Sequence, residues 1–154
     1  MLAARITKKW TPTLVEAFGP GVAKARQAEV MVAEAFASWG YEVLDCESDI
    51  QSQKHGIDLT IKHPSWRKAY SIDVKSNMNS YGTFFVETTP DGWLRNPSKV
   101  SDRICHVCVD TGWIVWYGRD QMVQWLRKNG QLKTGLFEVT TRHKIDFLNK
   151  RKIT

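Results

Sequence analysis

The chain has 154 residues, of which 42% are hydrophobic and 25% are charged, as is usual for a soluble globular protein and not for a disordered chain. No apolar run reaches the length of a membrane span, and the N-terminal segment lacks the apolar stretch of a signal peptide. We therefore expect an intracellular, cytoplasmic protein without a membrane partner. The net charge of +6 favours a polyanionic partner, with nucleic acid first among the candidates.

We expect one domain over residues 1–154, which begins with an extension of mixed composition at 1–20. Residues 22–39 are rich in alanine and carry apolar side chains along one side, which predicts a helix. Gly40 is suited to end that helix. The elements predicted next are a strand at 41–46 and a polar loop at 47–56.

Residues 57–62 and 69–75 predict a β-hairpin that gathers charged side chains. Both segments alternate between apolar and polar residues, so antiparallel pairing places the apolar side chains of both strands on one face. Asp58, Asp73 and Lys75 then share the opposite face, because side chains two residues apart on a strand point the same way.

The rest of the chain predicts further strands around a second helix. The order of a helix, a run of strands and another helix indicates an α/β (α+β) fold with a mixed central β-sheet flanked by helices. The predicted elements are a strand at 83–88, a buried hairpin at 103–110 and 113–118, a helix at 119–130, a short strand at 135–140 and a basic C-terminal tail at 141–154.

The charged face of the predicted hairpin has the residue types of a metal-assisted hydrolytic site. Two carboxylates can hold Mg²⁺, which prefers hard oxygen ligands and keeps several waters. A bound divalent ion makes water a better nucleophile and neutralises charge that builds on a phosphodiester, while a neighbouring lysine can orient that water. The alternative is a solvated sheet face with a surface salt bridge that contributes little.

Asp58, a hairpin connection and then Asp73-Val74-Lys75, with Glu29 on the preceding helix, resemble the core motif of the PD-(D/E)XK nuclease superfamily. The resemblance is to members like the Holliday-junction resolvases and the restriction endonucleases, and it covers roughly residues 25–77. It implies a restriction-endonuclease-like core. The chain departs from the usual pattern because Ile57, not proline, precedes the first acid, and because the second acid is aspartate, not glutamate.

This resemblance implies a metal-dependent endodeoxyribonuclease that hydrolyses DNA phosphodiester bonds with metal-activated water. Asp58 and Asp73 would be ligands of Mg²⁺, for which Mn²⁺ can substitute, and Lys75 would be catalytic. The Val74 carbonyl and Glu29 are further candidate ligands. We expect DNA as substrate, with branched or junction DNA as one candidate, a homodimer that pairs two active sites, and no small-molecule cofactor.

Glu29 has a rival on the same helix, and a third glutamate is a separate candidate. Glu29 lies on the apolar stripe of the helix at 22–39, where a metal site would explain a carboxylate, whereas Glu34 lies off that stripe. The alternative for Glu29 is an exposed, solvated helix glutamate. Glu87 would join the site if its strand neighboured that of Asp73, and an ordinary charge at a strand end is the alternative.

Several residues are candidates to contact DNA. Two of them follow Lys75 directly and could hydrogen-bond a phosphate, although turn chemistry alone would also explain them. Two tryptophans with basic neighbours could stack on bases, and packing onto the domain is the alternative. The candidates are Ser76, Asn77, Trp66, Arg67, Lys68, Trp93, Arg95, Lys99, Arg142 and Lys144, with Lys150, Arg151 and Lys152 further along the tail.

Cys105 and Cys108 have the spacing of a zinc half-site, but no second pair accompanies them. In a strand, residues three apart point to opposite faces, so buried structural thiols are the favoured interpretation. The second hypothesis for the whole chain is a non-catalytic nucleic-acid-binding module that uses its basic surface and exposed aromatic side chains.

Overall fold

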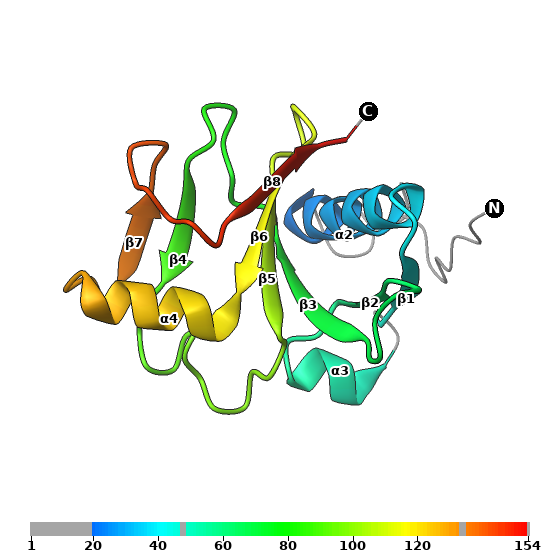
Figure 1. The fold of residues 1–154 in the computed structure, drawn as a ribbon, viewed down its shortest axis with the longest axis horizontal. Coiled ribbons are helices and arrows are strands. Elements are labelled where there is room, and N and C mark those ends of the chain that lie inside the picture. The colour runs from blue at the N-terminus through cyan, green and yellow to red at the C-terminus, as the bar shows by residue number, and fades with distance from the viewer. Residues whose placement is uncertain (1–19, 47–48, 133–134, 154) are drawn as a thin grey trace.

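The computed structural model describes residues 20–46, 49–132 and 135–153, so the extension predicted at 1–20 lies outside the described residues except for Pro20. Figure 1 labels the elements, which are α2 (Pro20–Ser38), β1 (Glu42–Asp45), α3 (Ile50–Lys54), β2 (Leu59–Lys62), β3 (Tyr70–Lys75), β4 (Phe84–Glu87), β5 (Arg103–Val107), β6 (Trp113–Gly118), α4 (Arg119–Lys128), β7 (Leu136–Val139) and β8 (Asn149–Lys152). The larger sheet has six strands in the order β1-β2-β3-β5-β6-β8, and β4 pairs with β7 in a second sheet.

The larger sheet is mixed, as predicted. Strands β1, β2 and β3 pair antiparallel in sequence order, and β5, β6 and β8 do the same. The two halves meet where β3 runs parallel to β5. The α/β (α+β) prediction with a mixed sheet and flanking helices is therefore confirmed. Among the helices in the described ranges, none combines the length and hydropathy needed to span a bilayer.

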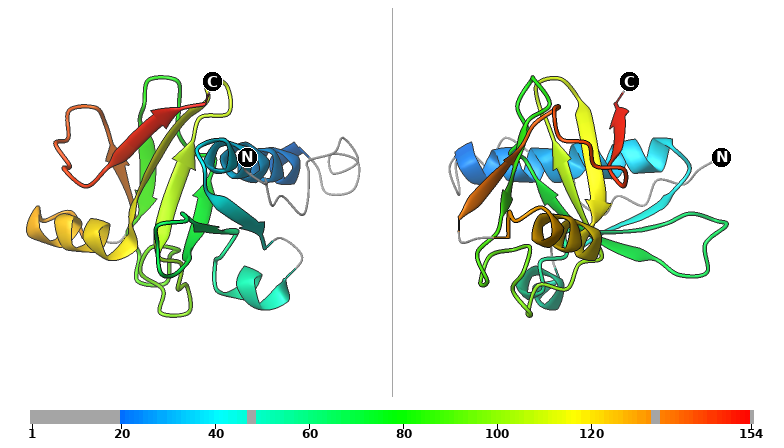
Figure 2. Two further views of the ribbon diagram at one scale, coloured as in Figure 1. Left: turned by 45° about the vertical axis from the view of Figure 1, so that its right-hand side comes forward. Right: turned by 60° about the vertical axis from the view of Figure 1, so that its left-hand side comes forward.

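Helix α2 covers one face of the larger sheet (Figure 2). Its buried side chains, among them Val32 and Phe36, pack against Leu59, Ile72 and Ile114 of the strands. The alanines of α2 let the helix approach the sheet closely, and the aromatic ring of Phe36 fills the space at its C-terminal end. This core holds the hairpin of β2 and β3 in place.

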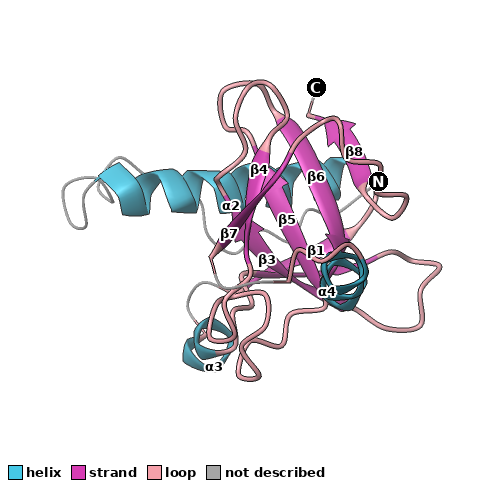
Figure 3. Cartoon of the chain, turned by 90° about the vertical axis from the view of Figure 1, so that its left-hand side faces the viewer, coloured by secondary structure: helices cyan, strands magenta, loops and turns pink. Residues whose placement is uncertain are grey.

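The opposite face of the larger sheet is covered by α4 and the β4-β7 sheet, which lie on the left-hand side of Figure 1, the side that faces the viewer in Figure 3. Ile104 and Tyr117 of the larger sheet pack there with Phe84 of β4 and with Met122 and Leu126 of α4. Because both faces of the central strands are covered, their residues form continuous apolar runs in the sequence. The same cover means that the face bearing Asp73 is not the solvated surface that alternation alone suggested.

Three segments differ from the predictions. The predicted polar loop at 47–56 contains α3, and the Asp49 carboxylate caps this helix by accepting a hydrogen bond from the Gln51 amide at 3.1 Å. Over its described residues the predicted tail at 141–154 is not a free extension, because β8 pairs with β6. Strand β4 pairs with β7 and not with β3, so Glu87 does not lie on a strand beside Asp73.

The cysteines are free and buried, as the interpretation of them as structural thiols predicted. Cys105 packs in the core under α2, whereas Cys108 belongs to the core on the other face. The two thiols therefore lie on opposite sides of the sheet and form no zinc half-site.

We predict that Phe36→Ala lowers the free energy of unfolding by about 3–5 kcal/mol, because it leaves a cavity under α2. The ring of Phe36 is 1% exposed and makes edge contacts with Trp39, Tyr41 and Trp116, each at 5.2 Å between ring centroids. Urea denaturation measures the change. Glu34→Ala, on the exposed side of α2, is the matched control and should change stability by less than about 0.5 kcal/mol. Equal losses in both variants would contradict this account of the core.

Candidate active site

Asp58 directly precedes β2, at a bulge in the pairing of β2 with β3. Leu59 is the register partner of Ile72, yet the Asp58 amide also donates to the Ile72 carbonyl at 2.9 Å. Two residues of one strand thus lie opposite one residue of the other, as in a β-bulge, and bulges re-aim side chains near functional sites. The strict alternation predicted for 57–62 is interrupted here. The Asp58 carboxylate turns back into the ladder, and its Oδ2 accepts a hydrogen bond from the Val74 amide at 2.7 Å.

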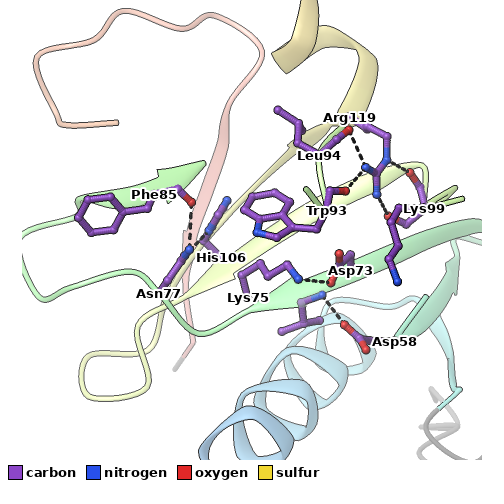
Figure 4. Close-up of polar contacts among 12 residues, drawn as sticks. Asp58, Asp73, Lys75, Asn77, Phe85, Trp93, Leu94, Lys99, His106 and Arg119 are labelled. Atoms are coloured by element: carbon purple, nitrogen blue, oxygen red, sulfur yellow. Dashed lines mark hydrogen bonds and ion pairs between the residues drawn. The ribbon is translucent and has the colours of Figure 1, made fainter. Parts of the chain in front are cut away.

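Asp73 and Lys75 project from the same face of β3, as predicted. Asp73 is 4% exposed, and its Oδ1 lies 3.3 Å from Lys75 Nζ. Beyond the effect of burial, the negative charge of Asp73 also acts on the Asp58 carboxylate and raises its pKa. Figure 4 shows the three side chains around the end of β3. The structure therefore brings together the three residues that the hairpin pattern placed on one site.

Negative charge is concentrated and poorly solvated around Asp58. Burial raises the pKa of this carboxyl well above its ordinary value, and the negative charges of Asp73 and Glu29 raise it further. The hydrogen bond from the Val74 amide opposes the shift but does not cancel it. Binding of a proton or of a cation would reduce the repulsion between these carboxylates.

Glu29 lies on the site side of α2 but is held by an arginine. Its Oε1 is 2.9 Å from Arg26 Nη1, and its side chain is 15% exposed. Arg26, itself 3% exposed, also donates to Asp45 of β1, with 3.1 Å between Nη1 and Oδ1. Glu34 is exposed, so of the two helix glutamates Glu29 is the one beside the carboxylates. The role of Arg26 was not predicted, although an arginine on the buried stripe of α2 was a visible signal.

Segment 88–102 closes one side of the site and is anchored by Arg119. The Arg119 side chain donates to the Ser101 and Leu94 carbonyls, both at 2.8 Å, and to the Trp93 carbonyl. The anchored Trp93 ring lies 4.9 Å from Lys75 Nζ, in a cation–π contact. Trp93 is therefore packed over Lys75 and is not a free aromatic side chain. The role of Arg119 was not predicted from the sequence, because its partners lie on a segment that is distant along the chain.

The same segment is tied to α3 on the other side of the site. The Val100 amide donates to the His55 carbonyl at 2.9 Å, and Lys99 Nζ donates to the Lys54 carbonyl at 3.1 Å. Gly56 makes this approach possible, since its φ is +70° and a Cβ there would lie 3.1 Å from Lys99 Cδ and 3.7 Å from Asp73 Oδ2. Lys99, predicted as a DNA contact, is thus a second lysine beside the carboxylates.

His106 lies on β5 opposite Lys75 and forms a buried network that was not predicted from the sequence. Its Nδ1 lies 2.6 Å from Asn77 Oδ1, and its Nε2 lies 2.7 Å from the Tyr117 hydroxyl. Burial, and then the charge of Lys75, lowers the pKa of His106 to about 3. The ring is therefore neutral, and it stacks on Phe84 with 4.2 Å between centroids. This network fixes the loop that follows β3.

The predicted aromatic and basic contacts separate into packed and exposed residues. Trp66 is half-buried against Tyr41 and Tyr70, with ring centroids 5.3 and 5.1 Å away. Arg95 is used within the protein, where its Nη1 donates to the Thr88 carbonyl at 2.9 Å. Ser76 is half-buried, and the exposed candidates are Asn77, Arg67, Lys68, Arg142, Lys144, Lys150, Arg151 and Lys152.

The oxygen ligands available for a metal ion are few. In the part of the chain that the structure describes, no group of three or more histidine, cysteine, aspartate or glutamate side chains is arranged to hold a metal. Asp58 and Asp73 supply a pair of carboxylates, and Glu29 is engaged by Arg26. Such a pair fits Mg²⁺, which needs only one or two protein carboxylates when waters and a substrate phosphate complete its shell.

Comparison of the chain with protein families, with curated proteins and with solved structures finds no match. What the chain could do chemically therefore rests on the geometry described above. That geometry is a pair of carboxylates, half-buried Asp58 and buried Asp73, with one lysine in contact with Asp73 and a second lysine beside it.

We predict that Asp58→Asn stabilises the protein at neutral pH in metal-free buffer. The folded pKa of Asp58 lies above its ordinary value of 3.8, so the folded state binds the proton more tightly than the unfolded chain does. The wild-type free energy of unfolding then falls as the pH rises from the unfolded pKa through the folded pKa. Asparagine can still accept from the Val74 amide, and it carries no charge to desolvate.

Urea denaturation from about pH 4 to about pH 8 checks this prediction. The advantage of Asp58→Asn over the wild type should grow with pH across that range. Asp120→Asn, at an exposed position of α4, is the control and should leave the slope with pH unchanged. A pH-independent loss of stability in Asp58→Asn would contradict the assignment.

Proposed function

We propose that this protein is a metal-dependent endodeoxyribonuclease with a restriction-endonuclease-like core, as its resemblance to the PD-(D/E)XK superfamily implies. The observation that carries the proposal is the convergence of Asp58, Asp73 and Lys75 at the end of β3, where burial and neighbouring charge raise the pKa of Asp58. Strongly perturbed carboxyl groups with a specific charge partner cluster at functional sites, so this pair is the first place to look for chemistry.

Each residue has a role that its surroundings support. Asp58 and Asp73 would hold Mg²⁺ or Mn²⁺, with the Val74 carbonyl as a further ligand. When bound, this ion supplies an activated water and neutralises the charge that builds on the phosphodiester. Lys75 orients the attacking water, and its contacts with Asp73 Oδ1 and the Trp93 ring limit the positions that its ammonium group can take. Glu29 adds negative charge beside the carboxylate pair, and its ion pair with Arg26 restricts the position of its own carboxylate.

Basic side chains beside the site and at one edge of the larger sheet are candidate phosphate contacts. Lys99 lies beside the carboxylates, and β8 exposes Lys150, Arg151 and Lys152 at the edge of the sheet. Two of these are held over aromatic rings, with Lys150 Nζ 4.8 Å from the Trp113 centroid and Arg151 Cζ 4.3 Å from that of Trp39. Cations that are already ordered lose less conformational entropy on binding DNA. A homodimer would pair two such sites and allow both strands to be cut.

A second function is favoured by one observation. Asp73 is 4% exposed, and segment 88–102 is anchored over it by Arg119 and by the contacts with α3. A site closed in this way is also compatible with a non-catalytic nucleic-acid-binding module, in which the carboxylates are structural. The two functions differ in whether DNA is cleaved when Mg²⁺ or Mn²⁺ is present.

We predict that Asp73→Asn and Lys75→Met each reduce metal-dependent DNA cleavage by at least about 100-fold, because they remove a metal ligand and the group that orients water. The assay incubates supercoiled, linear and four-way-junction DNA with Mg²⁺ or Mn²⁺, and filter binding in EDTA follows affinity separately. Affinity should change by less than about tenfold. Asp120→Asn and Lys128→Met, both exposed on α4, are the matched controls.

Wild-type protein that cuts none of the three substrates would favour the binding module. Wild-type cleavage that survives in Asp73→Asn would reject the assigned site while leaving nuclease activity in place. Cleavage that is lost only in the two site variants supports the proposal.

We predict that replacing Lys150 and Lys152 together by glutamine makes DNA binding less dependent on salt. The slope of log K against log salt concentration should become shallower by about 0.9 for each phosphate that the variant no longer neutralises, or roughly 2 for the pair. Fluorescence anisotropy between about 50 and 200 mM salt measures the slope. Lys128→Gln on α4 serves as the comparison, and an equal change in that variant would show that the effect is one of net charge and not of β8.

A further inference from the structure

An open pocket of about 320 Å³ lies beyond the end of β3, separate from the carboxylate pair. It is formed where the loops that follow β3 and β5 meet the first half of α2. Its lining residues are Lys24, Ser76, Asn77, Met78, Asn79, Ser80, Cys108, Val109 and Asp110. None of the roles assigned above to the carboxylates and lysines requires this space.

The position of the pocket in the fold favours a ligand. Strands β3 and β5 are the parallel pair of the sheet, and the pocket lies where both end. Ligands of α/β folds commonly bind outside the carboxyl ends of parallel strands. Ser76 follows Lys75 directly, so the pocket wall begins one residue, or about 3.3 Å along the chain, beyond the proposed catalytic lysine.

The wall of the pocket is rigid on the side nearest the site. The Asn77 side chain donates to the Phe85 carbonyl at 2.9 Å, and its oxygen is bonded to His106. The Asn79 side-chain oxygen accepts from the Tyr81 and Thr83 amides at 2.9 and 3.1 Å. These contacts shape the wall and occupy the side-chain oxygens of Asn77 and Asn79. The groups left to meet a ligand are the Ser76 hydroxyl, the amide nitrogen of the Asn79 side chain and two charged side chains.

Those two charges have opposite sign, which restricts the class of ligand. Lys24 is exposed and makes no ion pair with any residue that the structure describes, so its ammonium group can bind a phosphate. Asp110 repels a free anion but accepts hydrogen bonds from N–H or O–H donors. Buried Met78 and Cys108 add an apolar part to the wall. A phosphate joined to a sugar and a base satisfies all three kinds of contact, whereas inorganic phosphate satisfies only one.

We propose that this pocket binds one nucleotide of the DNA strand next to the phosphodiester that is cleaved, with its phosphate at Lys24 and its sugar or base against Asp110 and the apolar wall. The inference rests on the proposed function for its biological context, but binding of a mononucleotide can be measured without cleavage. The pocket volume lies at the lower end of the range for small-ligand sites, which is the size expected for a single nucleotide.

The thiol of Cys108 provides a readout within the pocket. Burial acts to raise its pKa, but hydrogen bonds from Thr111, Asp110 and Ser80 lower it overall. Burial raises the pKa of Cys105, which lies in the other core. Cys108 lines the pocket whereas Cys105 does not, so iodoacetamide should modify Cys108 before Cys105, and a bound nucleotide should slow this reaction.

The test is titration of the ¹⁵N-labelled protein with thymidine 5′-monophosphate, thymidine and inorganic phosphate, each alone. The monophosphate should shift the amide signals of 76–80 and 108–110 and protect Cys108 from iodoacetamide. Lys24→Met should weaken monophosphate binding by about tenfold, the loss expected for one charged hydrogen bond, and leave thymidine binding unchanged. Lys128→Met is the control.

The inference is overturned if no probe shifts these signals at millimolar concentration, if inorganic phosphate does so as well as the monophosphate, or if Lys24→Met binds like the wild type. Its failure is distinct from failure of the nuclease proposal. Monophosphate binding without any DNA cleavage would support the nucleotide pocket and reject the proposed nuclease activity. Cleavage by a Lys24→Met protein with unchanged KM for short DNA would support the nuclease activity and reject the nucleotide pocket.

Discussion

The burial of the Asp58 carboxylate beside Asp73 is the constraint around which this structure is organised. Removing one carboxylate from water is costly, and placing a second beside it adds repulsion. One backbone amide and one lysine offset part of this cost, and the raised pKa of Asp58 reflects the part that they do not offset. A carboxylate pair that is only partly compensated attracts a cation, and the proposal of metal binding rests on that property.

The surroundings of the pair limit both its motion and its access. Arg119 anchors segment 88–102 from the side of α4, and the His55 and Lys54 carbonyls hold it from the side of α3. Contacts on both sides of the site therefore hold Trp93 and Lys99 in place over it. Arg26 does the same for Glu29 on α2. A metal ion or phosphate would meet side chains that are already placed, which lowers the entropic cost of binding.

The hairpin and its three charged residues were predictable from the sequence, because alternation on both strands constrains which side chains share a face. The bulge at Asp58 was not predictable, since it depends on backbone hydrogen bonds that the residue types in this segment do not indicate. Burial of Asp73 was missed for a different reason. It depends on α4 and the β4-β7 sheet covering that face, and these contacts join segments that are distant in sequence. Strand β8 was missed because its residues are charged, although edge strands often carry exposed lysines.

Calorimetric titration with Mn²⁺ tests most directly whether the carboxylate pair binds a divalent cation, which is the central claim. The wild type should bind the ion, and as the pH is lowered binding should also release a proton, because the raised pKa of Asp58 lets a proton compete with the cation for this carboxylate. Repeating the titration in buffers of different ionisation enthalpy measures that proton. Asp58→Asn should lose both the binding and the proton release. Absence of Mn²⁺ binding by the folded wild type, or binding that Asp58→Asn leaves unchanged, would contradict the claim.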